Sequence, residues 1–113
     1  MIQELIYGSP PSKSNNYRRG KTGMFKPTKV TAYETIFGLQ CKNKNAKLDG
    51  HIRISLHVYF KNPNSDLDNS FKVILDCLEK YEVITNDRNV YEINAKKYVD
   101  RKNPRVIIKI EEI

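Results

Sequence analysis

Residues 51–60 alternate strictly between two kinds of side chain, and this segment constrains the fold more than any other. It reads HIRISLHVYF, in which every second residue from Ile52 to Phe60 is apolar. Successive side chains of a β-strand point to opposite faces of a sheet, so the pattern predicts a strand with one buried and one exposed face. The chain must therefore supply a layer that covers the buried face.

The segments on either side of this strand predict the other elements of the fold. Two segments have apolar residues at helical spacing, and three have strand character. The expected helices are Thr28 to about Lys42 and about Asp68 to Lys80, and the expected strands are residues 1–7, 90–99 and 105–110. The order β-α-β-α-β-β predicts an α+β (α/β-like) fold with a single mixed β-sheet covered by two helices. Strands joined through a helix should run parallel, and the last two strands should form an antiparallel, hairpin-like pair.

Length and composition favour one globular domain that spans residues 1–113. Hydrophobic residues make up 39% of the chain and charged residues 29%, which is an ordinary globular balance. No apolar run approaches the roughly 20 residues of a membrane span, and the first residues lack a signal-peptide pattern. Cys41 and Cys77 form neither a disulfide framework nor a metal cluster. We therefore expect a soluble, cytoplasmic protein that does not act at a membrane.

Positive charge is concentrated in the first half of the chain. Residues 13–47 contain nine lysines and arginines but a single acid, Glu34, so the whole net charge of +7 lies there. Within this region, residues 8–27 are rich in Gly, Pro, Ser and Asn and predict a long mobile loop. Such a basic region favours nucleic acid as partner before an anionic membrane, although a merely basic surface is the alternative.

Seven residues of this basic loop are candidate contacts to DNA. Basic and amide side chains can bind phosphate, and an aromatic ring beside arginines can stack on an unpaired base or anchor the loop. The candidates are Lys13, Asn16, Tyr17, Arg18, Arg19, Lys21 and Lys26.

Two carboxylates open the second expected helix, directly after the alternating strand. Asp66 and Asp68 are two residues apart across this turn and can converge on one point, with Lys72 one helical turn later. Mg²⁺ usually takes one or two carboxylates together with water and substrate phosphate. A third acid, Asp87, follows the helix. The same residues also fit helix capping, an ordinary ion pair and turn chemistry, which are the more common roles.

The residues around these acids resemble the RusA family of Holliday-junction resolvases. The family pattern has D-x-D-N, a lysine four residues after the second Asp, D-x-L along the helix, and an acidic turn before a valine. The matching residues here are Asp66, Asp68, Asn69, Lys72, Asp76, Leu78, Asp87 and Val90. The basic segment also resembles the opening of the family, so the resemblance spans nearly the whole chain. Asn86 is a departure, because family members commonly carry two adjacent acids in that turn.

The resemblance implies a homodimeric, Mg²⁺-dependent endodeoxyribonuclease that resolves four-way DNA junctions by nicking opposed strands, with Mn²⁺ as a substitute metal. In that case Asp66, Asp68 and Asp87 hold the metal, and Lys72 stabilises charge on the attacked phosphate or orients water. Asn69, Asp76 and Asn86 would support these groups or serve the fold. Two alternatives stay open: a catalytically silent basic DNA-binding module, and a related metal nuclease for flaps and other branched DNA.

Overall fold

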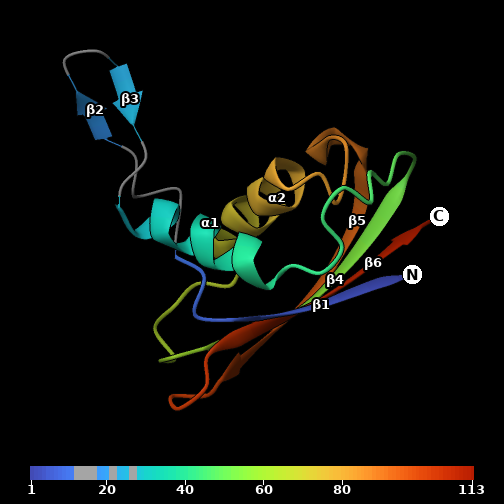
Figure 1. Ribbon diagram of the computed structural model, residues 1–113. Coiled ribbons are helices and arrows are strands. Elements are labelled where there is room, and N and C mark those ends of the chain that lie inside the picture. Colours follow the sequence, from blue (N-terminus) through green and yellow to red (C-terminus); the bar gives the residue numbers. More distant parts are fainter. Residues whose placement is uncertain (12–17, 21–22, 26–27) are drawn as a thin grey trace.

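The computed structural model describes residues 1–11, 18–20, 23–25 and 28–113. The elements are β1 (Ile2–Tyr7), β2 (Arg18–Gly20), β3 (Gly23–Phe25), α1 (Thr28–Gln40), β4 (Ile52–Phe60), η1 (Asp68–Ser70), α2 (Phe71–Lys80), η2 (Asp87–Asn89), β5 (Val90–Val99) and β6 (Arg105–Glu112). Four strands form one mixed sheet, and α1 and α2 lie on the same face of it (Figure 1). The expected α+β architecture is confirmed. None of the helices in the described ranges is long and apolar enough to cross a membrane.

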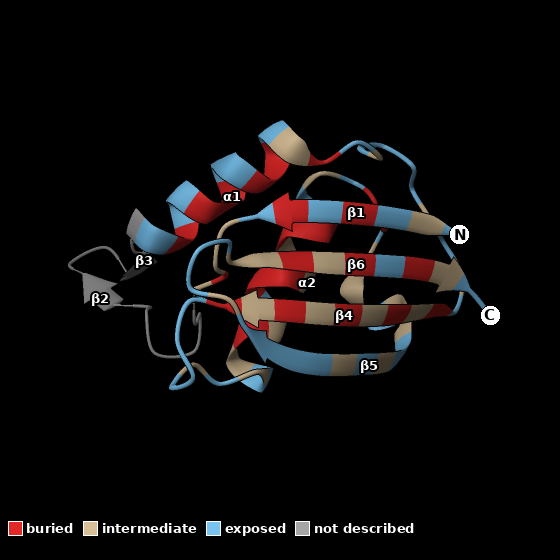
Figure 2. Ribbon diagram, turned by 90° about the horizontal axis from the view of Figure 1, so that it is seen from below, coloured by how far each residue is buried: buried red, intermediate tan, exposed pale blue. Residues whose placement is uncertain are grey.

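The four-stranded sheet has the order β1-β6-β4-β5 (Figure 2). As expected for strands joined through a helix, β4 and β5 pair in parallel. The expected hairpin between β5 and β6 is wrong, because β4 lies between them and pairs antiparallel with β6. β4 buries every second side chain along its whole length, so the central place in the sheet, with a partner on both edges, suits it best. β6 in turn separates β4 from β1, which runs in the same direction as β4.

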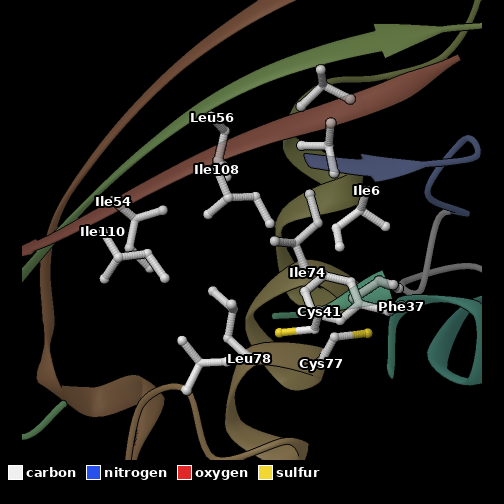
Figure 3. Close-up of a cluster of buried hydrophobic side chains, with 14 of the residues drawn as sticks. Ile6, Phe37, Cys41, Ile54, Leu56, Ile74, Cys77, Leu78, Ile108 and Ile110 are labelled. Atoms are coloured by element: carbon white, nitrogen blue, oxygen red, sulfur yellow. The ribbon is translucent and has the colours of Figure 1, made fainter. Parts of the chain in front are cut away.

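The hydrophobic core fills the space between the sheet and the two helices (Figure 3). The alternation of β4 is confirmed, since Ile52, Ile54, Leu56, Val58 and Phe60 are all buried. They face apolar side chains of the helices, including Val30, Tyr33 and Phe37 of α1 and Val73, Ile74, Cys77 and Leu78 of α2. Each fully buried Leu or Ile contributes about 1.5–3 kcal/mol to stability. Both cysteines are buried and unbridged.

The basic segment differs from the expected loop in one respect. Residues 18–20 and 23–25 form a short antiparallel ladder, β2 with β3, in which Gly20 pairs with Gly23. A ladder of three residues depends on backbone hydrogen bonds and needs no apolar alternation, so sequence periodicity gave no signal for it. The rest of the expected loop, residues 12–17, 21–22 and 26–27, lies outside the described residues.

A buried acid fixes the chain where it leaves α1. Glu4 of β1 is buried, and its carboxylate accepts hydrogen bonds from the backbone N–H groups of Lys42 and Asn43 at 2.7–3.1 Å. The side chain of Asn43 donates a further bond of 2.6 Å to the same carboxylate. A buried carboxylate is stable when charged donors or backbone N–H groups satisfy it. Glu4 therefore ties the end of α1 to the sheet.

The two helices meet through a glycine and a tyrosine. Tyr81, directly after α2, donates a hydrogen bond of 2.7 Å from its Oη to the carbonyl oxygen of Glu34 in α1. Its ring lies parallel to that of Phe37, with the centroids 6.3 Å apart and 8° between the planes. The ring passes so close to Gly38 that a Cβ there would lie 2.3 Å from Tyr81 Cζ. Gly38 is therefore required for the contact between α1 and α2.

Candidate functional site

Asp66 lies in the turn that leads from the central strand to α2. β4 ends at Phe60, and the chain passes through residues 61–67 before η1 begins at Asp68. The carboxylate of Asp66 is exposed and accepts a hydrogen bond of 3.1 Å from the side-chain amide of Asn69. Leu67 packs against the core, whereas the acids on either side of it are exposed to solvent. The turn borders a hollow of about 220 Å³ lined by Pro10, Phe60, Asn64, Ser65, Asp66, Asn69 and Ser70.

Lys72 lies one helical turn after Asp68 and pairs with two other acids. Its Nζ is 3.6 Å from Asp76 Oδ1 and 3.8 Å from Asp87 Oδ2. The lysine side chain is 62% exposed, so each pair contributes at most about 1 kcal/mol to stability. Within the described part of the chain, the i,i+4 ion pair of Lys72 is thus with Asp76 and not with Asp68. The ammonium group is held beside Asp87 while staying accessible.

Asp87 belongs to a group of three carboxylates beside α2. One oxygen each of Asp76, Glu79 and Asp87 lie within 4.8 Å of one another, and all three residues are partly buried. Asn86, at the departure from the family pattern, accepts a hydrogen bond of 2.9 Å from the backbone N–H of Arg88 and so caps η2. A short polar side chain is sufficient for that capping role. The group of three carboxylates therefore contains one predicted metal ligand, Asp87, and two residues of α2, Asp76 and Glu79.

The predicted ligand set and the observed group share only Asp87. In the chain segments that the structure describes, no group of three metal-ligating side chains within 4.8 Å includes Asp66 or Asp68. The assignment of Asp66, Asp68 and Asp87 as ligands stays a prediction. Sequence reasoning missed Glu79, although a signal was present: Lys72, Asp76 and Glu79 recur at helical spacing and therefore share one face of α2.

The amino-acid sequence of this site can be compared with known proteins. The profile of a family described as Endodeoxyribonuclease RusA matches residues 8–111. This chain belongs to the RusA family. One relative, the "Crossover junction endodeoxyribonuclease RusA" of Aquifex aeolicus (strain VF5), is 36% identical to it over 113 aligned positions. That alignment covers 96% of this chain and 90% of the relative. The resemblance found from the D-x-D-N pattern is confirmed.

The structure describes only part of the basic segment of this RusA-family chain. Arg18 and Arg19 lie in β2, opposite Phe25 and Met24 of β3. The other predicted DNA contacts, Lys13, Asn16, Tyr17, Lys21 and Lys26, lie outside the described residues. The match to the RusA profile covers both this basic segment and the acidic residues of the candidate site. The predicted DNA contacts stay predictions.

Proposed function

We propose that this protein is a metal-dependent endodeoxyribonuclease that resolves four-way DNA junctions. The observation that carries the proposal is Lys72, held between the carboxylates of Asp76 and Asp87 within the acidic motif of a RusA-family chain. A positive group beside carboxylates suits phosphoryl chemistry, which needs a site for a cation and a group that neutralises the phosphate. The name of the Aquifex relative, a crossover junction endodeoxyribonuclease, supports junction DNA as the substrate.

The donor chemistry of the site fits a hard divalent cation. The carboxylates of Asp66, Asp68 and Asp87 offer oxygen ligands, which Mg²⁺ and Mn²⁺ both accept. When bound, Mg²⁺ lowers the pKa of a coordinated water and neutralises phosphoryl oxygens. The neighbouring acids Asp76 and Glu79 add negative charge around Asp87, which attracts a cation, and Lys72 offsets part of their mutual repulsion.

Lys72 has a second role in the proposed reaction. Hydrolysis joins the oxygen of water to phosphorus and breaks one phosphorus–oxygen bond to a sugar, whose oxygen takes up a proton. Negative charge on the phosphate rises during this step, and an exposed ammonium group can stabilise it. The contacts to Asp76 and Asp87 keep this ammonium group at the site before DNA binds.

Two copies of the protein are proposed to act on one junction. Resolution by paired nicking cuts two opposed strands, and a two-fold symmetric dimer presents two equivalent sites to a junction of matching symmetry. The basic segment, with Arg18 and Arg19 and the candidates outside the described residues, is proposed to bind the phosphates of the arms. The proposed place of action is the cytoplasm.

The proposal is tested with a synthetic four-way junction, incubated with the purified protein with and without Mg²⁺. We expect cleavage that requires the metal, and we expect Asp68→Asn to bind the junction while cleaving it about 100-fold more slowly or worse. Glu112→Gln, which removes one negative charge at the end of β6, is the matched control and should cleave normally.

Three results would count against the proposal in different ways. Near-normal cleavage by Asp68→Asn would reject its place at the metal. Tight binding without cleavage of any branched DNA, in Mg²⁺ or Mn²⁺, would identify a silent DNA-binding module. A strong preference for flaps over four-way junctions would identify a related nuclease with a different substrate.

A further inference from the structure

A lysine of β5 reaches across the sheet edge to the turn that carries Asp66. Lys97 is paired in register with Val58 of β4, whose side chain is buried under the helices, so Lys97 projects from the same face. Its Nζ donates hydrogen bonds to the carbonyl oxygen of Pro63 at 2.7 Å and to that of Ser65 at 2.5 Å. The same ammonium lies 5.8 Å from the centroid of the Phe60 ring. Lys97 thus contacts the last residue of β4 and two carbonyl oxygens of the turn.

Two hydrogen bonds within the described residues of this part of the chain are local. The backbone N–H of Asn64 donates to the side chain of Asn62 two residues earlier, at 3.0 Å. The bond from Asn69 to Asp66 also stays within this part of the chain. Residues 61–64 are exposed, so little apolar burial holds them in place. The two bonds from Lys97 link the turn to β5 and therefore to the rigid sheet.

We propose that Lys97 is a positioning residue for the cleavage site, which sets the place of Asp66 by holding the carbonyl groups of Pro63 and Ser65. The inference rests on the proposed function, and it adds a residue that the acidic motif does not contain. Ser65 directly precedes Asp66, so a fixed Ser65 carbonyl restricts where the neighbouring carboxylate can lie. Without the two hydrogen bonds from Lys97, Asp66 occupies the metal-binding arrangement for a smaller fraction of the time. The apparent metal affinity then falls by the same factor as this occupied fraction.

The test compares Lys97→Met, Lys97→Arg and the control Lys96→Met. Methionine keeps most of the apolar stem and removes the donors, whereas arginine keeps a charged group that donates to carbonyl oxygens. Lys96 precedes Lys97 in β5 and projects from the opposite face, so its substitution removes the same charge without touching the turn. Two measurements need no DNA: Mn²⁺ binding followed by electron paramagnetic resonance, and amide hydrogen exchange of residues 62–67. A third is the Mg²⁺ concentration that gives half-maximal cleavage of the junction.

For Lys97→Met we expect the half-maximal Mg²⁺ concentration and the Mn²⁺ dissociation constant to rise about 10- to 100-fold, the usual effect of removing a group that orients a metal ligand. Turnover at saturating Mg²⁺ and junction affinity should stay close to those of the parent. Amide exchange of the turn should be faster in Lys97→Met. Lys97→Arg should recover much of the metal affinity, and Lys96→Met should match the parent in all three measurements.

Several outcomes would overturn the inference. If Lys97→Met leaves the metal affinity and the amide hydrogen exchange of the turn unchanged, the hydrogen bonds from Lys97 do not position Asp66. Equal effects of Lys96→Met and Lys97→Met would assign them to the lost positive charge and not to the hydrogen bonds between Lys97 and the turn. If the parent cleaves no branched DNA, the proposed function fails, whereas the Mn²⁺ and exchange measurements still decide whether Lys97 controls the metal-binding turn.

Discussion

Replacing Gly38 with alanine should destabilise the protein, although alanine is the better helix former. In an exposed helix interior, Gly→Ala stabilises by about 1 kcal/mol. At this position the new Cβ would lie 2.3 Å from Tyr81 Cζ and 2.4 Å from its Oη, far inside van der Waals contact. The ring cannot withdraw without losing its hydrogen bond to Glu34 and its packing on Phe37.

The size of the effect follows from these opposing terms. Overpacking at a well-packed contact costs about 1–3 kcal/mol, and a lost hydrogen bond costs about 1 kcal/mol more. After the gain in helix propensity is subtracted, we expect Gly38→Ala to lower the free energy of unfolding by about 1–3 kcal/mol. At this chain length each kcal/mol corresponds to roughly 4 °C in the melting temperature.

The assay is urea unfolding followed by circular dichroism, with two comparisons. Ala32→Gly, at an exposed position of the same helix, measures the propensity term alone and should cost about 1 kcal/mol. Gly38→Ala should become neutral or stabilising when Tyr81 is also replaced by alanine, because the clash is gone. A higher urea midpoint for Gly38→Ala alone, or no coupling in the double variant, would refute the reasoning.

Three further predictions concern other contacts of the structure. Glu4→Gln should lower the free energy of unfolding by about 1.5–3 kcal/mol, because a charged acceptor of backbone and Asn43 hydrogen bonds is lost; an unchanged urea midpoint would contradict this. Lys72→Met should slow junction cleavage at saturating Mg²⁺ while leaving the half-maximal Mg²⁺ concentration near that of the parent; equal turnover would reduce Lys72 to a surface ion-pair partner. The Arg105 guanidinium holds the pKa of Asp100 below its usual range, so this carboxylate stabilises the fold at neutral pH and loses its effect as the pH falls through the lowered pKa. The difference in unfolding free energy between the parent and Asp100→Asn should therefore shrink in acid. Urea unfolding at several pH values measures this difference, and a constant value would exclude a link between protonation of Asp100 and stability.

The sequence predicts the elements of this fold better than their arrangement. The alternation in residues 52–60 is a local property, and it correctly identified both the strand and its buried face. Strand order is a non-local property, because it depends on which strand is stabilised most by a partner strand on each of its two edges. The hairpin expected for residues 90–110 failed for this reason, since β4 takes the place between β5 and β6.

The candidate site likewise has local features that the sequence predicts and non-local contacts that it does not. The D-x-D-N pattern correctly indicated the RusA family, whereas the assignment of Asp66, Asp68 and Asp87 as site residues stays a prediction. The neighbours of Asp87 depend on how the chain returns after α2. Val83 donates a backbone hydrogen bond to the carbonyl oxygen of Leu78, which folds the start of this return against the end of the helix. The proximity of Asp76 and Glu79 to Asp87 therefore needed the structure.

The place of β6 in the sheet has a consequence for how the protein is made. A ribosome delivers residues 105–112 after every other strand, yet these residues form the ladder that joins β1 to β4. A nascent chain that lacks them can assemble the contiguous β4-α2-β5 unit but leaves β1 without a partner strand. The edge of β4 that pairs with β6 is then open, and an unpaired strand edge can pair with another chain. Synthesis of β6 thus completes the four-stranded sheet on which the candidate site is built.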